Sequence, residues 1–469
     1  MRLINTKTLR FQEFFDPPPY AILSHRWTDQ GEVSFEEYNL IHEAAHDGEI
    51  SAFASKVAQI QRKSGYKKIL EFCRHAASSN GCQWVWIDTC CIDKKSSAEL
   101  SEAINSMYKW YQGSDICYIL LSDVPPSANY SNSELYSWLE RFKSSAWFKR
   151  CWTLQELLAP LRLLFCDGQW NAICELQKMR ANRPPSCSIA SDRLKGIDFF
   201  KEISRVTTID STILDGTSRK YVSIARRMSW AASREATRAE DVAYSLLGVL
   251  GVNLPLLYGE GGARAFMRLQ REILDVTQDE SILAWDTLQD LSQMPSLYNS
   301  SSTSTGVLAR QPNDFKDGGN IAPLFRLVRN SATDPLAHIP GSFSWRRTYG
   351  LSQSCLLLSS DSIRAFFAVR SSRLFLRAVI FPLYCNVKLS GRGHWPFLLL
   401  LPCDDVASID NYSAAKATDC LGRHVFFRRA ICSSTMRPSN EADVPDNLLP
   451  PFLRELQQVP VKAEVRAIL

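Results

Sequence analysis

Short apolar runs alternate with longer stretches of helical periodicity over the first third of the chain. Four runs of five or six residues stand at 20–24, 84–88, 116–121 and 161–166, and polar residues follow each of them. A continuous apolar run of this length between polar residues is typical of a strand that is buried on both faces. We therefore expect four such strands in this part of the chain.

Helical spacing is clearest between the second and third of these runs. The apolar residues of the stretch 97–110 fall on one helical face: Leu100, Ile104, Met107 and Tyr108. A second helix is expected over 65–78, before the Asn80-Gly81 turn. Strands that alternate with helices in this way predict an α/β fold with an open, mostly parallel sheet and flanking helices.

The pattern changes twice in the rest of the chain. Residues 171–298 are mainly helical in periodicity, and residues 299–306 are a run of serine, threonine, asparagine and glycine that favours a linker. The clearest helical segments are 221–230, 238–249 and 263–274. Short apolar and aromatic runs then predict a β-rich C-terminal region over 307–469. The expected domains are therefore 1–170, 171–298 and 307–469.

The composition excludes several classes of protein. Of the 469 residues, 45% are hydrophobic and 22% are charged, as in soluble globular proteins, so neither disorder nor a fibrous repeat is indicated. The basic residues exceed the acidic ones by only 54 to 49, which does not favour a nucleic-acid-binding surface. No apolar run is long enough to span a bilayer or to act as a secretory signal, so a cytoplasmic protein is expected. The 14 cysteines include no Cys-x-x-Cys pair, and we expect reduced thiols and no metal site.

Polar side chains follow the first two predicted strands at their carboxyl ends. The first strand leads into Ser24, Arg26 and Trp27, and the second into Asp88. Ligands of open parallel sheets bind outside the carboxyl ends of the strands, so these side chains are expected to meet in one crevice. Arg26 can bind a phosphate there, and Trp27 can stack on a base. The alternative is that these residues only cap helices, or, for Arg26, form a surface salt bridge.

Three sequence blocks carry a family resemblance. They are Tyr-Ala-Ile-Leu-Ser-His-Arg-Trp at 20–27, Trp-Ile-Asp-Thr-Cys-Cys-Ile-Asp-Lys at 86–94 and Trp-Thr-Leu-Gln-Glu-Leu-Leu-Ala-Pro at 152–160. In this order they resemble the signature blocks of fungal heterokaryon-incompatibility (HET) domains. Further blocks up to residue 262 resemble the helical extension of one HET subfamily, so the resemblance covers about residues 1–290.

Two positions depart from the family pattern. Thr28 replaces the glycine that is usual after the tryptophan of the first block, and Cys151 replaces the glycine that is usual before Trp152. A side chain at a glycine position can distort a loop, so both departures bear on whether the domain is active.

HET domains are in turn similar to Toll/interleukin-1 receptor (TIR) domains, which share a flavodoxin-like open sheet and include enzymes that cleave NAD. Residues 144–156 resemble the TIR segment in which a tryptophan precedes the helix with the catalytic glutamate. This resemblance makes Glu156 the catalytic candidate and NAD the candidate substrate, with no tightly bound cofactor. The residues expected to shape the pocket are Ser24, Arg26, Trp27, Asp88 and Trp152.

Trp152 and Glu156 are four residues apart, so they share one face if the segment is helical. The aromatic ring can stack on nicotinamide, and the carboxylate can stabilise the positive charge that develops on the ribose during cleavage. The competing interpretation is structural: Glu156 complements the dipole at a helix start while Trp152 packs in the core.

Three other patterns have simpler explanations than a site. The zinc-protease pattern His-Glu-x-x-His occurs at 42–46, but an Asp-Gly pair follows at once and no third ligand stands at a suitable spacing. His25 with Cys90 or Cys91 could form the base and nucleophile of a cysteine hydrolase. The simpler interpretation is that these cysteines are buried and structural. The basic residues within 226–238 alternate with carboxylates and indicate a solvated helix face.

These observations predict an effector of fungal heterokaryon (vegetative) incompatibility, a non-self recognition response that ends in programmed cell death. Two biochemical acts stay open at this level. One is NAD cleavage assisted by Glu156; the other is a non-enzymatic module that acts by self-association or through contacts with other incompatibility proteins. Neither act requires nucleic acid or a membrane span.

Overall fold

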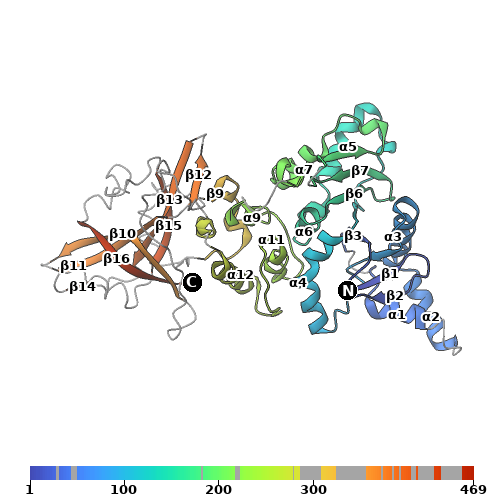
Figure 1. Cartoon of the computed structure of the whole chain (residues 1–469), viewed down its shortest axis with the longest axis horizontal. Helices are drawn as coiled ribbons and strands as arrows, with labels where there is room; N and C mark the ends of the chain where they lie inside the picture. The colour runs from blue at the N-terminus through green and yellow to red at the C-terminus, as the bar shows by residue number, and fades with distance from the viewer. Residues whose placement is uncertain are drawn as a thin grey trace. The chain divides into compact units, whose positions relative to one another are not determined.

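The computed structural model describes two compact units (Figure 1). One consists of Met1–Arg219 with Arg234–Gly259, and the other of Lys220–Ser233 with Glu260–Leu469. The described residues are 1–27, 31–43, 50–180, 183–216, 222–277, 279–285, 308–323 and the strands between 355 and 468. The predicted linker 299–306 lies outside them.

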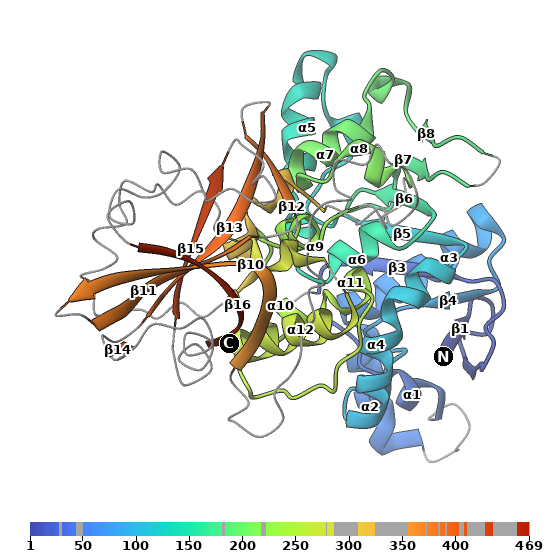
Figure 2. The same ribbon diagram turned by 60° about the vertical axis from the view of Figure 1, so that its left-hand side comes forward.

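An eight-stranded sheet forms the centre of the first unit. In sheet order its strands are β2 (Phe11–Glu13), β1 (Arg2–Asn5), β4 (Trp84–Trp86), β3 (Ala21–His25), β5 (Ile116–Leu120), β6 (Arg162–Cys166), β7 (Ala172–Gln177) and β8 (Ser186–Ile189). The four central strands, β4, β3, β5 and β6, are parallel and lie side by side in Figure 2. The remaining pairings are antiparallel, so the sheet is mixed, and the expectation of a mostly parallel sheet holds only for its centre.

The four predicted strands are confirmed as this parallel centre. Both β3 and β5 are buried along their whole length, as expected for strands covered on both faces. Along the sheet, the second strand of the four is followed by the first, third and fourth, which is the order of flavodoxin-like folds. The connections reverse direction between β3 and β5, and the carboxyl ends of these two strands therefore border the crevice where such folds bind ligands.

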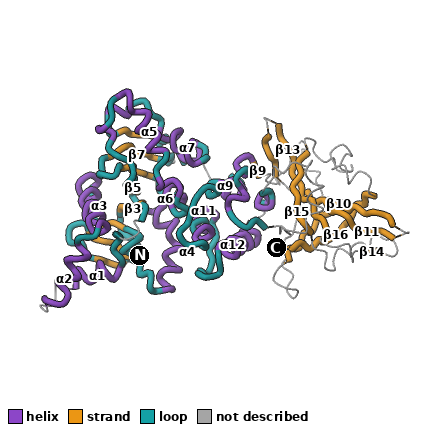
Figure 3. Tube along the Cα trace, turned by 180° about the vertical axis from the view of Figure 1, so that it is seen from behind, coloured by secondary structure: helices purple, strands orange, loops and turns teal. Residues whose placement is uncertain are grey.

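Helices cover both faces of this sheet. Their bounds are α1 (Phe35–Glu43), α2 (Ile50–Gln61), α3 (Ser64–Asn80), α4 (Ser97–Gly113), α5 (Leu135–Lys143), α6 (Thr153–Leu158), α7 (Phe199–Thr207), α8 (Ser211–Leu214), α10 (Asp241–Tyr244) and α11 (Leu247–Leu250). Figures 1 and 3 show α3 on one face, and α4 with α6 on the opposite face. This arrangement follows from right-handed crossovers. The connection through α3 leads from β3 to β4, whereas those through α4 and α6 lead in the opposite direction along the sheet, to β5 and β6, so their helices lie on the opposite face.

The helical region expected from residue 171 begins later in the structure. The segment 172–189 instead forms β7 and β8, which extend the sheet beyond β6. The turn into β7 places Trp170 in the left-handed region, with φ of 66°, while Asp167 accepts hydrogen bonds from the amides of Gln169 and Asn171. Pairing with β6 decides the conformation here, and the local pattern does not reveal that partner.

The second unit contains α9 (Ile224–Ser229), α12 (Gly262–Val276) and a separate antiparallel sheet. The path of this sheet is β16 (Gln457–Ile468), β10 (Cys355–Arg370), β11 (Arg373–Pro382), β13 (Arg392–Pro402), β12 (Cys385–Leu389) and β9 (Ile321–Pro323). In addition, β14 (Ser408–Ile409) pairs with β11, and β15 (Phe427–Ser434) pairs with β13. No helix in the described part of the chain is long and apolar enough to cross a membrane.

Candidate functional site

A buried polar cluster joins the carboxyl end of β3 to α6. The Ser24 hydroxyl donates a hydrogen bond to the Glu156 carboxylate and accepts one from the indole N–H of Trp147 at 2.8 Å. Glu156 is only 6% exposed, and Ser24 and Trp147 are fully buried. The structure thus brings together two residues that the sequence analysis assigned to one site, and adds a tryptophan from the short helical turn before α6.

Burial raises the pKa of Glu156 from 4.5 to about 8. The hydrogen bond from Ser24 opposes this shift, the negative charge of Asp88 adds to it, and the positive charges of Arg150 and Arg234 oppose it. A carboxyl group with such a pKa gains or loses its proton near neutral pH, which suits a general acid or base.

The helix that carries Glu156 is held at its carboxyl end by a buried lysine. The Lys178 ammonium donates to the carbonyls of Leu157 at 2.7 Å and Leu158 at 2.8 Å. A cation at the carboxyl end of a helix complements the helix dipole and satisfies carbonyls that have no helical partner. Lys178, which directly follows β7, therefore positions α6.

Arg234 holds the other end of α6. Its guanidinium donates to the carbonyl of Arg150 and to the hydroxyl of Thr153, both at 2.9 Å. Arg234 is 8% exposed, and burial lowers its pKa to about 10. The expectation of a solvated helix face for this basic segment is therefore wrong at Arg234, because tertiary contacts that sequence spacing does not reveal enclose the side chain.

A second cluster surrounds Asp88, after the end of β4. The Trp27 indole donates to Asp88 at 2.7 Å, and the Lys94 ammonium lies 3.8 Å from the centre of the Trp27 ring. Trp27 is 41% exposed, so this cluster reaches the surface, unlike Glu156. Burial raises the pKa of Asp88. An exposed aromatic ring beside a carboxylate and an ammonium can bind a planar, charged ligand.

His25 lies beneath this second cluster, between two carboxylates. Its ring nitrogens are 3.8 Å from Glu32 and 3.9 Å from Asp88, beyond hydrogen-bond distance. Burial lowers its pKa well below 6.5, and the positive charges of Lys68 and Lys94 add to this shift. The imidazole is therefore neutral at neutral pH.

The cysteines after β4 lack the surroundings of a catalytic nucleophile. Cys90 and Cys91 are both buried, and burial raises the pKa of Cys90 well above 9. The Cys91 sulfur accepts the backbone N–H of Ile87 at 3.4 Å. A thiol that holds its proton, as at Cys90, reacts slowly, and the burial of both cysteines favours structural roles over a cysteine hydrolase.

The remaining two predicted site residues lie elsewhere. Arg26 is exposed, and its guanidinium has no hydrogen bond or ion pair within the described residues. The Trp152 indole donates to Asp241 at 3.1 Å, and Asp241 also accepts from Tyr258 at 3.0 Å. Trp152 is thus bonded to the segment 234–259, not to the Ser24–Glu156 cluster.

Of the two positions that depart from the family pattern, the structure describes only Cys151. Cys151 is buried, its backbone N–H donates to the carbonyl of Glu235 at 2.9 Å, and burial raises the pKa of its thiol to about 12. Its side chain is therefore part of the core beside α6. Thr28 lies outside the described residues.

Of the two histidines in the zinc-protease pattern, the structure describes only His42. His42 packs against the ring of Tyr38, with centroids 5.0 Å apart, and α1 ends at Glu43. Residues 44–49 lie outside the described residues. Across the part of the chain that is described, no group of three or more possible ligands could hold a metal ion.

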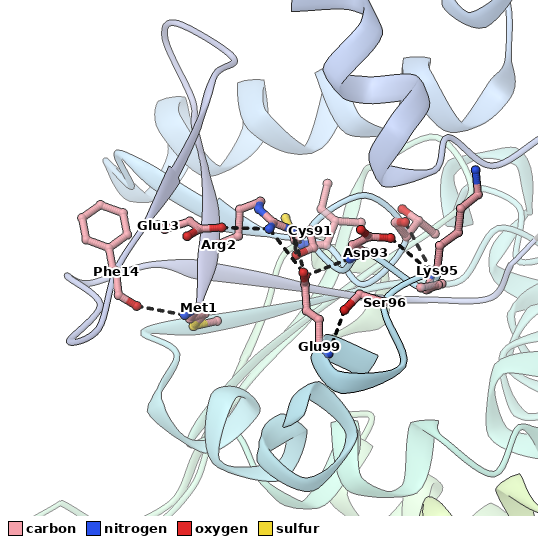
Figure 4. A network of polar contacts seen from close by, with 12 residues as sticks. Met1, Arg2, Glu13, Phe14, Cys91, Asp93, Lys95, Ser96 and Glu99 are labelled. Carbon is pink, nitrogen blue, oxygen red and sulfur yellow. Dashed lines mark hydrogen bonds and ion pairs between the residues drawn. The ribbon is translucent and has the colours of Figure 1, made fainter. Parts of the chain in front are cut away.

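Glu99 fixes the turn that carries Asp88 and Lys94, and Figure 4 shows its contacts with Arg2 and Asp93. The Glu99 carboxylate accepts from the Arg2 guanidinium and from the amide of Asp93, both at 2.8 Å. Arg2 also donates to the carbonyl of Cys91 at 3.3 Å. The amino-terminal strand therefore stabilises a turn about 90 residues further along the chain.

Replacing Glu99 with alanine should destabilise the first unit by about 2 kcal/mol, because the partly buried Arg2 guanidinium loses one of its two carboxylates and the Asp93 amide loses its acceptor. Glu13 provides a matched control, since it binds the same guanidinium at 2.8 Å but its side chain is 72% exposed. Glu13→Ala should cost less than about 0.5 kcal/mol. Urea denaturation measures both, and equal losses in the two variants would contradict the role given to Glu99.

Comparisons with known proteins agree with the signature blocks. Residues 20–136 match the family model described as Heterokaryon incompatibility protein (HET). Over 257 residues the chain is 37% identical to the Vegetative incompatibility protein HET-E-1 of Podospora anserina. That alignment covers 55% of this chain but only 16% of the relative, so the chain matches a small part of a much longer protein. No solved structure matches.

Proposed function

This chain carries a heterokaryon-incompatibility (HET) domain, and from that premise we propose that it is an effector of fungal vegetative incompatibility that triggers programmed cell death. The observation that carries the proposal is the likeness to the vegetative incompatibility protein of Podospora anserina, which extends beyond the family match. We place the effector function in the first unit, where polar side chains lie at the carboxyl ends of the parallel strands.

The enzymatic form of the proposal is hydrolysis of NAD at the bond between nicotinamide and ribose. Nicotinamide leaves with the bonding electrons, water adds to the ribose carbon, and one proton is released. In this scheme Glu156 stabilises the positive charge on the ribose and accepts the proton from water. Only the ionised carboxylate can do either, so a pKa of about 8 predicts that the rate of cleavage rises with pH up to about 8. The exposed Trp27 offers a face on which an aromatic ring can stack.

Access to Glu156 is the condition for this chemistry. The carboxylate is 6% exposed and bound by Ser24, so a substrate must displace Ser24 or a conformational change must open the cluster. We propose that self-association of several copies makes this change. Single copies should then be nearly inactive, and the self-associated, or clustered, protein should be active.

The burial of Glu156 also favours a second function. In this version the domain is a non-enzymatic module that acts through self-association or through partner contacts. A buried Glu156 bonded to Ser24, with Ser24 bonded to Trp147, is also a sufficient structural explanation of these residues. In this version Glu156 has no contact with a substrate, and its replacement matters only through stability.

Nicotinamide release separates the two versions. The whole chain, alone and fused to an oligomerising tag, is incubated with NAD, and nicotinamide is measured by chromatography. The enzymatic version predicts release by the clustered protein and a loss of at least about a hundredfold in Glu156→Gln. Glu140→Gln is the control, because Glu140 lies on the surface and pairs with Lys143.

Expression in a fungal host tests the effector role itself. The wild-type chain should stop growth, as should Glu140→Gln. Arrest by Glu156→Gln at the same protein level, together with no nicotinamide release from the clustered wild type, supports the non-enzymatic module. Normal growth with the wild type at a verified protein level would refute the effector role.

A further inference from the structure

A groove of about 500 Å³ lies beside the turn that follows β4. The α1 and α2 helices and this turn form its walls, and most of the residues that line it are charged. The charged residues are Glu36, Glu37, Lys56, Lys94 and Lys95. Its volume lies within the range of small-molecule sites, and Leu40 with the alkyl parts of the long side chains gives it apolar lining between the charged groups.

Both carboxylates of the groove are already neutralised. Glu36 pairs with Lys95 at 3.1 Å and accepts the Ser34 hydroxyl at 2.7 Å, and these contacts lower its pKa. Glu37 binds the Lys63 ammonium through both oxygens, at 2.7 and 2.8 Å. Neither carboxylate therefore remains to balance the other two lysines of the groove.

Lys56 and Lys94 supply the excess positive charge. Among the described residues, neither ammonium has a carboxylate within ion-pair distance. Partial burial lowers the pKa of Lys94, and the negative charges of Asp88 and Glu32 oppose this shift from further away. Lys94 donates to the carbonyl of Thr89 at 3.3 Å and covers one face of the Trp27 ring. Both lysines are exposed at the groove, where an anion can reach them.

We propose that this groove binds the phosphate groups of a small phosphorylated ligand, with Lys56 and Lys94 as its counter-charges. Two ammonium groups offset most of the negative charge of a diphosphate, and lysines bind phosphates as point charges without demanding one geometry. Lys94 links the groove to the exposed Trp27, so a diphosphate that is esterified to an aromatic group can occupy both. The inference does not depend on Glu156 or on cleavage of NAD.

Inorganic pyrophosphate is the probe, titrated into the whole chain at low salt in a calorimeter. Lys56→Ala and Lys94→Ala should each weaken binding about tenfold, the effect of losing one charge-assisted contact. Lys94→Arg keeps the charge and should bind within about threefold of wild type, which separates loss of charge from a disturbed Trp27. Lys195→Ala, a surface lysine paired with Asp192, should bind as wild type does.

Several results would overturn the proposal. They are no heat of binding at millimolar pyrophosphate, equal binding of sulfate, or unchanged affinity in the Lys56→Ala, Lys94→Ala double variant. Glu156→Gln should bind pyrophosphate as tightly as wild type. A chain that binds pyrophosphate but never releases nicotinamide therefore leaves this inference standing while the enzymatic function fails.

Discussion

Glu156→Gln should remove most of the fall in stability that the first unit shows as pH rises from 5 to 8. The folded-state pKa is about 8 against 4.5 for the free side chain, so the folded protein keeps a proton that the unfolded chain releases. The stabilisation is complete below pH 4.5 and is lost as pH rises through this window, by at most about 5 kcal/mol. Glutamine stays neutral at every pH and still accepts the Ser24 hydroxyl.

Urea denaturation at pH 5.5, 7 and 8.5 measures this effect. The wild type should weaken steadily across the series, whereas Glu156→Gln should stay nearly level and be the more stable protein at pH 8.5. Glu140→Gln is again the matched control and should follow the wild type, because Glu140 is exposed to solvent. A wild-type slope that persists in Glu156→Gln would show that another group carries the pH dependence.

Gly248→Ala should cause the largest loss of stability, about 3 kcal/mol or more. A Cβ added at Gly248 in α11 would lie 2.0 Å from the Cβ of Tyr108 and 2.5 Å from its Cγ, in α4. Real Cβ atoms do not approach so closely, and the near side of a tyrosine cannot rotate away. The α11 helix must therefore move off α4, and the packing between them is lost.

Two comparisons isolate the steric cause. Gly251→Ala meets no atom within 4 Å, and its φ of 76° predicts a cost of only about 1 to 2 kcal/mol. In a Tyr108→Ala background, Gly248→Ala should cost at least about 2 kcal/mol less than in wild type, because the clash is relieved. Chemical denaturation of the wild type, the three single variants and the double variant gives these values, and an unchanged cost in the Tyr108→Ala background would reject the contact with α4.

The local pattern of the chain predicted the parallel centre of the sheet closely. The strands at 20–24 and 116–121 correspond to β3 and β5, and the helix at 97–110 to α4. These elements are periodic over their whole length and end at polar residues, so their conformation depends mainly on neighbours in sequence. Trp27 bonds to Asp88, and Ser24 bonds to Glu156 of α6, but the two pairs form separate clusters and not the single crevice expected at the strand ends.

Elements with distant partners were harder to predict. The sequence pattern predicts a helical region from residue 171, but β7 and β8 form there, because β7 pairs with β6 and β8 pairs with β7. The helical pattern at 238–249 was predicted as one helix, and it forms two short ones, α10 and α11. The second of them, α11, packs against α4 and α6, and the local periodicity does not contain these contacts.

The sequence by itself determined the α/β class of the first unit, its four central strands and the HET signature blocks, since these depend on residues close together in the chain. Only the tertiary structure decided the state of Glu156. Its hydrogen-bond partner Ser24 is 132 residues away in sequence, and the positive charge of Arg234 comes from a segment that returns to the first unit later. Burial and charge from such distant neighbours set a pKa, and for this reason a glutamate at the start of a short helix became a buried carboxyl group that titrates near pH 8.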